Sequence, residues 1–366
     1  MKQAYTNNEV FLGHMIAGTS GHSLTLDTID KKILLELSLN ARAPYTSIAK
    51  HIGISREQVT YRIERLLQKE ILTGTLTLIN PRVFNARIYE LYLRIKSLTT
   101  ERKQELTAYF VQHPKTQWVA TCGSSYDYAL TLLCTTLEEF DDTLSSIKEH
   151  IGENLVELLV HPVLYEEHTW KPYIEELYSP EQIFKKFRTW KGKDDGSYQK
   201  YFVERIHHNS SPLQYDAIDK KIIRAIERDA RKTMIQISQE TKLSYDTIKK
   251  HLKELILQGT IQSFIPVISA PLLGFQWNLV FLNINTYNKK RILALETTLH
   301  SHPSIAYISR VTASSTTYVL SLMVKDAQQY NDILQRLRTQ YADIIKTYEH
   351  LIIFESHKYT PLTALL

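Results

Sequence analysis

Cysteine is scarce in this chain of 366 residues, which contains only Cys122 and Cys134. A metal site built from thiolates or imidazoles needs several Cys or His residues at short spacing, and neither cysteine has such neighbours. Few cysteines are also typical of proteins in a reducing compartment. We therefore expect two buried free thiols, a cytoplasmic location, and no metal or other cofactor.

Long apolar runs are absent as well. No stretch of about 18 consecutive apolar residues occurs, so nothing predicts a membrane-spanning helix. The beginning of the chain lacks the basic start and apolar core of a secretory signal. The formal charge of +5 is modest, so a nucleic-acid partner is expected only where the positive charge is clustered.

Common catalytic motifs are missing too. The sequence contains no glycine-rich phosphate loop, no HExxH and no GxSxG. Histidines such as His51, His161 and His168 stand alone, and isolated histidines are more often surface or core residues than ligands. These absences lead us to expect that the chain is not an enzyme.

What the chain does have is an internal repeat. Asp27 and Asp30 have counterparts in Asp216 and Asp219, 189 positions later, and His113-Pro114 recurs at the same offset. Identity at one offset over so long a stretch indicates a tandem duplication, with copies at about 24–173 and 213–362. The expected segments are an N-terminal arm (1–23), a winged helix-turn-helix domain (24–82), a ferredoxin-like domain (83–173), a partly helical linker (174–212), a second winged helix-turn-helix domain (213–271) and a second ferredoxin-like domain (272–366).

The first third of each copy has the pattern of a helix-turn-helix unit. In copy one, Asp27 is placed to cap a first helix, and Ser55 with Gln58 forms a capping box for a third helix. That third helix has apolar residues at a spacing of four and then three, which predicts one buried stripe. A short turn between two helices is the helix-turn-helix geometry. We expect a small hairpin, the wing, after it, at 71–76 in copy one and 261–265 in copy two.

The other face of each third helix is polar and basic. Residues 26–70 carry eight Lys/Arg against six Asp/Glu, and residues 215–259 carry ten against seven. An α-helix fits the major groove, where such side chains contact phosphates and base edges. We therefore predict binding of double-stranded DNA. The candidate contact residues are Ser55, Arg56, Gln58, Thr60, Tyr61, Arg62 and Arg65 in copy one, and Ser244, Tyr245, Thr247, Lys249, Lys250 and Lys253 in copy two.

The rest of each copy predicts strand, helix, strand, strand, helix, strand. In copy one the strands are expected at 88–95, 118–122, 128–134 and 155–164, with helices between them. This order is that of a ferredoxin-like α+β unit, whose helices cover one sheet face and leave the other in need of a partner. The fold class is therefore α+β, with a winged helix-turn-helix and a ferredoxin-like domain in each copy.

The combination resembles the Lrp/AsnC family of prokaryotic transcription regulators. The residues that carry the resemblance are Leu26-Asp27-x-x-Asp30, Ile54-Ser55-x-x-x-Val59-x-x-Arg62-Ile63, His113-Pro114 and Gly123-x-x-Tyr126-Asp127-Tyr128, with Leu243-Ser244-x-x-x-Ile248, Gly259-Thr260-Ile261 and His302-Pro303 in copy two. The resemblance implies a sequence-specific regulator, an internal pseudo-dimer with packed sheet faces, and further homo-oligomers.

The resemblance also implies a sensor for a small molecule such as an amino acid, at the loop that contains Gly123, Tyr126 and Asp127. Asp127 could pair with an α-amino group, and backbone N–H groups beside Gly123 could hold a carboxylate. The alternative is a tight turn that uses glycine for its backbone freedom. In copy two the loop 312–317 has neither glycine nor acid, so sensing there is asymmetric or lost.

Two other functions stay open. One is an enzyme similar to the sirohaem decarboxylases, which have a similar paired architecture but carry a His-Asn-Tyr stretch that neither 117–122 nor 306–311 offers. The other is a partner that pairs with related regulators without binding DNA. For the regulator, the two recognition helices differ in residues, so we expect a non-palindromic DNA site read with fixed polarity.

Overall fold

The computed structural model describes residues 24–168, 215–286 and 288–362. The predicted N-terminal arm at 1–23 and the predicted linker helix within 174–212 lie outside these residues. Among the described helices, none combines the length and apolar character needed to cross a bilayer. Cys122 and Cys134 are buried free thiols, and burial raises the pKa of Cys134 to about 11.

The helix-turn-helix unit of copy one consists of α1 (Thr28–Leu39), α2 (Tyr45–Ile52) and α3 (Arg56–Gln68). The cap predictions are confirmed. Asp27 accepts hydrogen bonds from the backbone N–H groups of Ile29 and Asp30, and Ser55 and Gln58 form a full capping box. Gly53 ends α2 with a φ of 82°, a left-handed conformation that costs glycine nothing. The apolar stripe of α3 is buried as expected.

Copy two repeats this unit as α8 (Ala217–Ile226), α9 (Met234–Thr241) and α10 (Tyr245–Gln258). Ser244 accepts a hydrogen bond from the N–H of Thr247, as Ser55 does from Gln58. Ile248, Leu252 and Leu255 are buried, so α10 packs through the predicted stripe. The duplication predicted from the sequence is therefore present in the helices.

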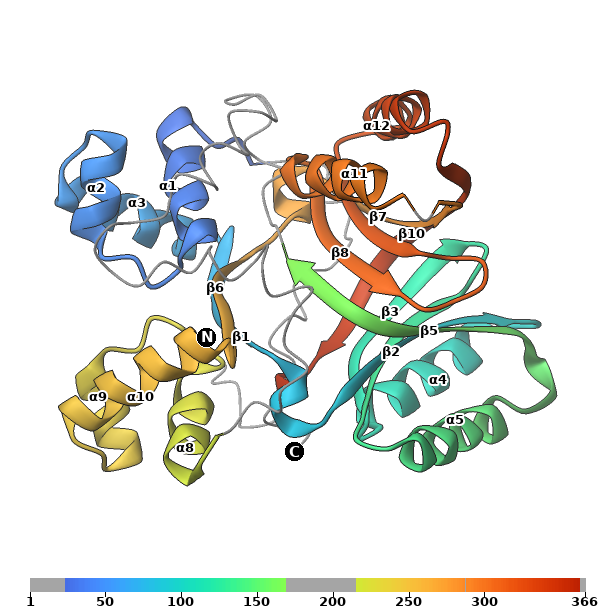
Figure 1. The fold of residues 1–366 in the computed structure, drawn as a ribbon, viewed down its shortest axis with the longest axis horizontal. Coiled ribbons are helices and arrows are strands. Elements are labelled where there is room, and N and C mark those ends of the chain that lie inside the picture. The colour runs from blue at the N-terminus through green and yellow to red at the C-terminus, as the bar shows by residue number, and fades with distance from the viewer. Residues whose placement is uncertain (1–23, 169–214, 287, 363–366) are drawn as a thin grey trace.

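The predicted wing hairpins are wrong. Each copy has a single long strand there, β1 (Leu72–Ile79) and β6 (Ile261–Ile268), and the two strands pair with each other, antiparallel, as a separate two-stranded sheet. A lone hairpin is marginally stable, whereas pairing across the copies lets both strands bury apolar side chains on the helices and on the barrel. Figure 1 shows this sheet between the helix-turn-helix units and the rest of the molecule.

Short 3-10 turns at Pro81–Phe84 and Pro271–Leu273 lead from this sheet into the ferredoxin-like domains. Copy one contains β2 (Arg87–Ile95), α4 (Thr100–Gln112), β3 (Thr116–Ser124), β4 (Tyr128–Cys134), α5 (Leu137–Ile151) and β5 (Leu155–His168). Copy two contains β7 (Gln276–Ile284), α11 (Lys289–Ser301), β8 (Ile305–Val311), β9 (Tyr318–Val324), α12 (Ala327–Gln340) and β10 (Ile345–Tyr359). The predicted order of strands and helices is confirmed in both copies.

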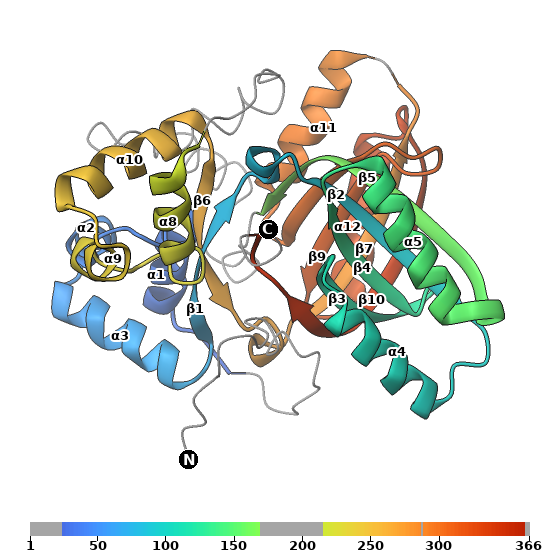
Figure 2. The ribbon, with the colours of Figure 1, turned by 90° about the horizontal axis from the view of Figure 1, so that it is seen from below.

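The two four-stranded sheets join edge to edge into one closed barrel. Its strand order is β10-β3-β4-β2-β5-β8-β9-β7, so β10 pairs with β3 and β5 pairs with β8 at the two seams. An apolar cluster inside the barrel includes Tyr92, Ala129, Phe281 and Ile353 and draws on both copies. The helices of each copy cover the outside of their own sheet (Figures 1 and 2). The internal pseudo-dimer expected from the resemblance thus has its sheet faces packed together, and strand pairing at the seams adds to that packing.

Candidate functional site

The two helix-turn-helix units lie on the same side of the molecule, across the β1–β6 sheet from the barrel, in both views (Figures 1 and 2). They are joined by a reciprocal contact. The guanidinium of Arg42 donates to the carbonyl oxygen of Ala230, and that of Arg231 donates to the carbonyl oxygens of Ala41 and Ala43. Because Ala41-Arg42 and Ala230-Arg231 are equivalent in the repeat, the contact is symmetric. It joins the two units at the turn that follows the first helix of each.

On α3, part of the predicted DNA-contacting set faces solvent. Ser55, Arg56 and Gln58 are exposed, and Tyr61 is 64% exposed, a large fraction for so large an aromatic side chain. Thr60 is half-buried and its hydroxyl donates to the carbonyl oxygen of Arg56. The first two turns of α3 therefore present a mixed polar surface with one free-standing cation.

Arg62 and Arg65 of α3 turn toward α1 instead. Arg62 Nη1 lies 2.6 Å from Asp27 Oδ2 and 2.9 Å from Asp30 Oδ1, and Arg65 Nη2 lies 2.5 Å from Asp30 Oδ2. Only 20% of the Arg62 side chain and 3% of the Asp30 side chain are exposed. The hydrogen bonds from Arg62 help to hold the pKa of the Asp27 carboxyl below its usual value, against the opposing effect of burial. The positive charges of these two arginines are therefore paired with carboxylates inside the domain.

On α10 the corresponding place of Arg62 is taken by His251, whose Nδ1 lies 2.8 Å from Asp219 Oδ1. Lys249, Lys250 and Lys253 are exposed on the outer face, and Tyr245 is 53% exposed. The hydroxyl of Thr247 hydrogen-bonds that of Ser244 at the helix start. Copy two therefore offers three outward lysines where copy one offers a single outward arginine.

Asp216, Asp219 and His251 bring ligand atoms within 4.8 Å of one another, a spacing that could suit a metal ion. The equivalent residues of copy one are Asp27, Asp30 and Arg62, and a guanidinium cannot ligate a metal. The shared geometry is a hydrogen-bonded contact between a carboxylate of the first helix and a side chain of the third helix. We explain the cluster in copy two in the same way.

The predicted effector loop lies at the end of the β3–β4 hairpin. The Asp127 carboxylate accepts a hydrogen bond from the backbone N–H of Ile95 at 2.7 Å, and the Tyr126 hydroxyl donates to Glu157 at 3.0 Å. A Cβ atom at Gly123 would come within 2.5 Å of the Phe354 ring of copy two, so glycine lets the two copies approach closely here. The three residues thus have structural roles, and effector binding at this loop stays a prediction.

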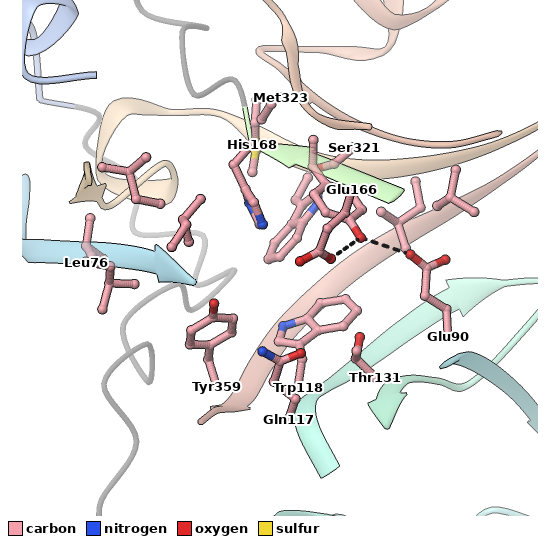
Figure 3. Close-up of a pocket in the computed structure, with 18 of the residues that line it drawn as sticks. Leu76, Glu90, Gln117, Trp118, Thr131, Glu166, His168, Ser321, Met323 and Tyr359 are labelled. Carbon is pink, nitrogen blue, oxygen red and sulfur yellow. Dashed lines mark hydrogen bonds between the residues drawn. The ribbon is translucent and has the colours of Figure 1, made fainter. Parts of the chain in front are cut away.

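A second feature, which no sequence motif predicts, is a cavity of about 120 Å³ between the β1–β6 sheet and one end of the barrel (Figure 3). Its lining comes from both copies. The lining residues are Leu76, Leu78, Glu90, Tyr92, Gln117, Trp118, Thr131, Glu166, His168, Ile265, Pro266, Val267, Trp277, Leu279, Ala306, Tyr307, Val319, Ser321, Met323 and Tyr359.

A hydrogen-bonded group lies at the barrel end of this cavity. The Tyr307 hydroxyl is 3.1 Å from Glu90 Oε1 and 2.9 Å from Glu166 Oε2, and Tyr92 donates to Glu90 at 3.0 Å. One phenol proton cannot serve both carboxylates, so a protonated Glu90 satisfies the geometry by donating to the Tyr307 oxygen. Burial raises the pKa of Glu90 to about 7, which agrees with that arrangement. Burial also lowers the pKa of His168, so its imidazole is neutral at pH 7.

Sequence reasoning missed this site because its residues are far apart in the chain and belong to no motif. The signal that could have pointed to it is Glu90, a lone acidic residue within the β-rich run 88–95. A charge in a strand buried on both faces requires a partner or a function. Nothing in the sequence places Tyr307 or Glu166 beside it.

Known proteins resemble the chain in two ways. An AsnC-type helix-turn-helix domain matches residues 26–67, and a winged helix-turn-helix DNA-binding domain matches residues 215–262. A proline dehydrogenase transcriptional activator of Rhodobacter capsulatus is 26% identical over 117 residues, 31% of this chain and 75% of its own length. The HTH-type transcriptional regulator LrpA of Pyrococcus horikoshii is 46% identical over 57 residues, 16% of this chain and 40% of its own length.

The fold and these matches define a helix-turn-helix protein with paired ferredoxin-like domains. The helix-turn-helix region of copy one is similar to that of the AsnC-type regulators, as the sequence motifs indicated, and copy two carries a second helix-turn-helix region of the same kind.

The whole architecture also resembles a solved enzyme structure. The sirohaem decarboxylase NirDL superposes with a TM-score of 0.58 at 11% sequence identity, covering 91% of this chain and 93% of that chain. The expectation that this chain is not an enzyme is therefore wrong as an exclusion, because the same fold over the whole chain carries an enzyme. Motif searches cannot exclude a site whose groups come from separate strands, as the cavity at Glu90 shows.

Proposed function

We propose that this protein is a DNA-binding transcription regulator of Lrp/AsnC type that reads a duplex with α3 and α10 together. The observation that carries the proposal is the reciprocal Arg42–Arg231 contact, which holds two outward-facing recognition helices in one fixed relation. Paired recognition helices at fixed spacing are the means by which helix-turn-helix dimers read two half-sites. The regulators that match each copy support the same function.

Within this function the thirteen predicted contact residues divide by what they touch. Ser55, Arg56, Gln58 and Tyr61 in copy one, and Ser244, Tyr245, Lys249, Lys250 and Lys253 in copy two, are exposed and reach the DNA. Thr60 and Thr247 are half-buried and contribute at the helix starts. Arg62 and Arg65 pair with Asp30, so they support DNA binding mainly by holding α3 in place.

Selection of bound fragments from random duplex DNA tests this proposal. We expect one enriched site with two unlike halves, bound in one orientation, because α3 and α10 present different side chains. Binding should weaken steeply with salt, as phosphate contacts by lysine require. Failure to enrich any sequence, or binding without salt dependence, would falsify the proposal.

A second candidate function is an enzyme acting on a tetrapyrrole, and the observation that favours it is the whole-chain likeness to NirDL. Titration of the purified protein with sirohaem, followed by absorption and by mass analysis of the product, tests it directly. The described lining of the central cavity contains no Lys or Arg to pair with a substrate carboxylate. We therefore place the regulator first.

A small-molecule effector and a homo-oligomer of chains are further parts of the proposed function. Both come from the family resemblance. Size measurement by light scattering, with and without amino acids, tests the oligomer. Amino-acid binding to Asp127→Asn and to the wild type tests the effector loop.

A further inference from the structure

We propose that the central cavity between the β1–β6 sheet and the barrel binds a small organic cation, a protonated amine with an apolar body, and that its occupancy is coupled to DNA binding. The amine class and the coupling go beyond the proposed function, and the coupling rests on it.

The charge of the cavity favours a cation. Glu90 and Glu166 both line it, and their oxygens converge on the Tyr307 hydroxyl. No Lys or Arg is among the described lining residues, and His168 is neutral by burial. Because Glu90 holds its proton, Glu166 is the charged group, and a carboxylate ligand such as an amino acid would bring a second negative charge beside it. An amine without a carboxylate supplies the missing positive charge and hydrogen-bond donors.

The walls suit an organic cation with an apolar body. Trp118 and Trp277 lie with ring centroids 5.3 Å apart, and the rings of His168 and Tyr307 are 4.9 Å apart. Tyr359 closes the side nearest β1 (Figure 3). Aromatic faces attract a cation within about 6 Å and also bury apolar surface. A volume of about 120 Å³ is near that of the engineered cavity that holds benzene, so the ligand is a single ring or a short chain.

A buried hydroxyl lies in the cavity without a protein partner. Ser321 is 1% exposed, lines the cavity, and its Oγ makes no hydrogen bond to the described residues. An unpaired buried hydroxyl costs roughly 1–3 kcal/mol, so buried hydroxyls normally have partners. A ligand amine or hydroxyl in this cavity satisfies it.

The position of the cavity couples it to DNA binding. Leu76 and Leu78 of β1 and Ile265 and Val267 of β6 form one wall, and the barrel forms the other. The wall continues directly into the recognition unit, since the backbone N–H of Ile71 donates to the carbonyl oxygen of Leu66 in α3. A ligand that prefers one geometry of the β1–β6 sheet therefore biases how α3 and α10 lie relative to each other, together with the Arg42–Arg231 contact, and by linkage DNA changes the ligand's affinity by the same factor.

The test uses the full chain and three probes of one shape: benzylamine, benzyl alcohol and benzoate. Binding is followed by calorimetry at pH 7.5. We expect saturable binding of benzylamine, about tenfold weaker binding of benzyl alcohol, and still weaker binding of benzoate, because a hydrogen-bonded charge pair is worth about a factor of ten or more. Benzoate binding as tight as benzylamine would overturn the cation site.

A matched pair of variants locates the charge. Glu166→Gln removes one cavity carboxylate at nearly constant shape, and we expect a tenfold loss of benzylamine affinity with benzyl alcohol affinity retained. Glu355→Gln changes the residue that the repeat aligns with Glu166, whose side chain is 46% exposed on β10, and should leave both affinities unchanged. Retained benzyl alcohol binding also reports that E166Q is folded. If that variant fails to fold, Tyr307→Phe tests the same group. Equal effects of E166Q and E355Q contradict the proposal.

The coupling has its own measurement. DNA affinity is measured with and without saturating benzylamine, and we expect a change of threefold or more in wild type and none in E166Q at the same amine concentration. Unchanged DNA affinity in the wild type would refute the coupling while the calorimetry judges the site. DNA binding without amine tests the proposed regulator function separately, so the two failures are distinguishable.

Discussion

The two recognition modules share one frame and use their charges differently. In copy one, Arg62 and Arg65 of α3 bond to Asp30 of α1, and the outer face keeps Arg56 as its exposed cation at the helix start. In copy two, His251 makes the inner contact, and three lysines stay outside. The charge of one helix is thus paired within its own domain, and the other helix presents three positive charges to solvent. A count of basic residues alone hides this difference, because only the structure shows which cations are already paired.

The largest expected effect comes from removing the outer charge of copy two. Lys249→Ala, Lys250→Ala and Lys253→Ala together should weaken DNA binding by about 100-fold at 0.15 M salt and lower the salt slope by about 3, since each phosphate contact contributes about 0.9. Arg56→Ala in copy one should cost only about fivefold on the same basis. Fluorescence anisotropy over a salt series measures both. Equal losses from the two helices would break the comparison.

The second expected effect is a pH dependence of stability that comes from the copy-one half of the barrel and has no counterpart in the copy-two half. Glu90 is buried in copy one, and the repeat places Leu279 at the same position in copy two. Because burial raises the pKa of Glu90 to about 7, the folded state holds its proton more tightly than the unfolded chain between about pH 4.5 and 7. Stability from this group is therefore present at low pH and is lost as pH rises through 7.

Glu90→Leu gives copy one the residue of copy two and removes that dependence. We expect the free energy of unfolding of the variant, relative to that of the wild type, to rise by about 2 kcal/mol between pH 5 and pH 8. Urea unfolding at the two pH values measures the difference. If the difference in unfolding free energy between the variant and the wild type is the same at both pH values, Glu90 ionises with its ordinary pKa. His161 lies beside Glu90, with its Nδ1 4.0 Å from Glu90 Oε2, and burial lowers the pKa of His161 to about 4, so its own contribution to stability changes with pH in the opposite direction.

A smaller effect should distinguish the inner ion pairs. Asp30→Asn leaves two arginines without their buried partner and should destabilise the fold by about 2 kcal/mol, discounted because both arginines are partly exposed. Asp219→Asn affects a single histidine contact and should cost less, about 1 kcal/mol. Hydrogen exchange in α3 and α10 locates each loss. A larger loss of stability from Asp219→Asn than from Asp30→Asn would contradict the expectation that the contact between the first and third helices is stronger in copy one.

The smallest expected difference is between Arg42 and Arg231, where the copies are alike. Each donates to a backbone carbonyl oxygen of the other copy and lies over an aromatic ring, Phe264 for Arg42 and Tyr45 for Arg231. Arg42→Met and Arg231→Met should each cost about 1–2 kcal/mol and differ by less than about 0.5 kcal/mol. Thermal melting of the two variants side by side is sufficient. A clear inequality would show that the contact is not reciprocal in solution.

Local rules predicted the elements well and their partners poorly. The caps at Asp27 and Ser55 and the buried stripe of α3 depend on residues within one or two turns, so periodicity and capping chemistry find them. The pairing of β1 with β6 joins residues roughly 190 positions apart, and a strand does not encode its partner; the predicted wings failed for that reason. The inward direction of the Arg62 side chain could not be predicted because it depends on how α1 packs on α3. The cavity at Glu90 could not be predicted because its lining forms only when both copies fold together.

The closed barrel has two seams, and both join one copy to the other within a single covalent chain. Two separate subunits that share such a sheet come apart on dilution, and their DNA occupancy then rises with a threshold in concentration. Here the paired state has no dissociation constant of its own, because the second half is always present at the effective concentration set by the chain. A single molecule of this protein is a complete pair of recognition helices. At a site for one chain, occupancy should therefore follow protein concentration in a simple hyperbola down to the lowest cellular copy number.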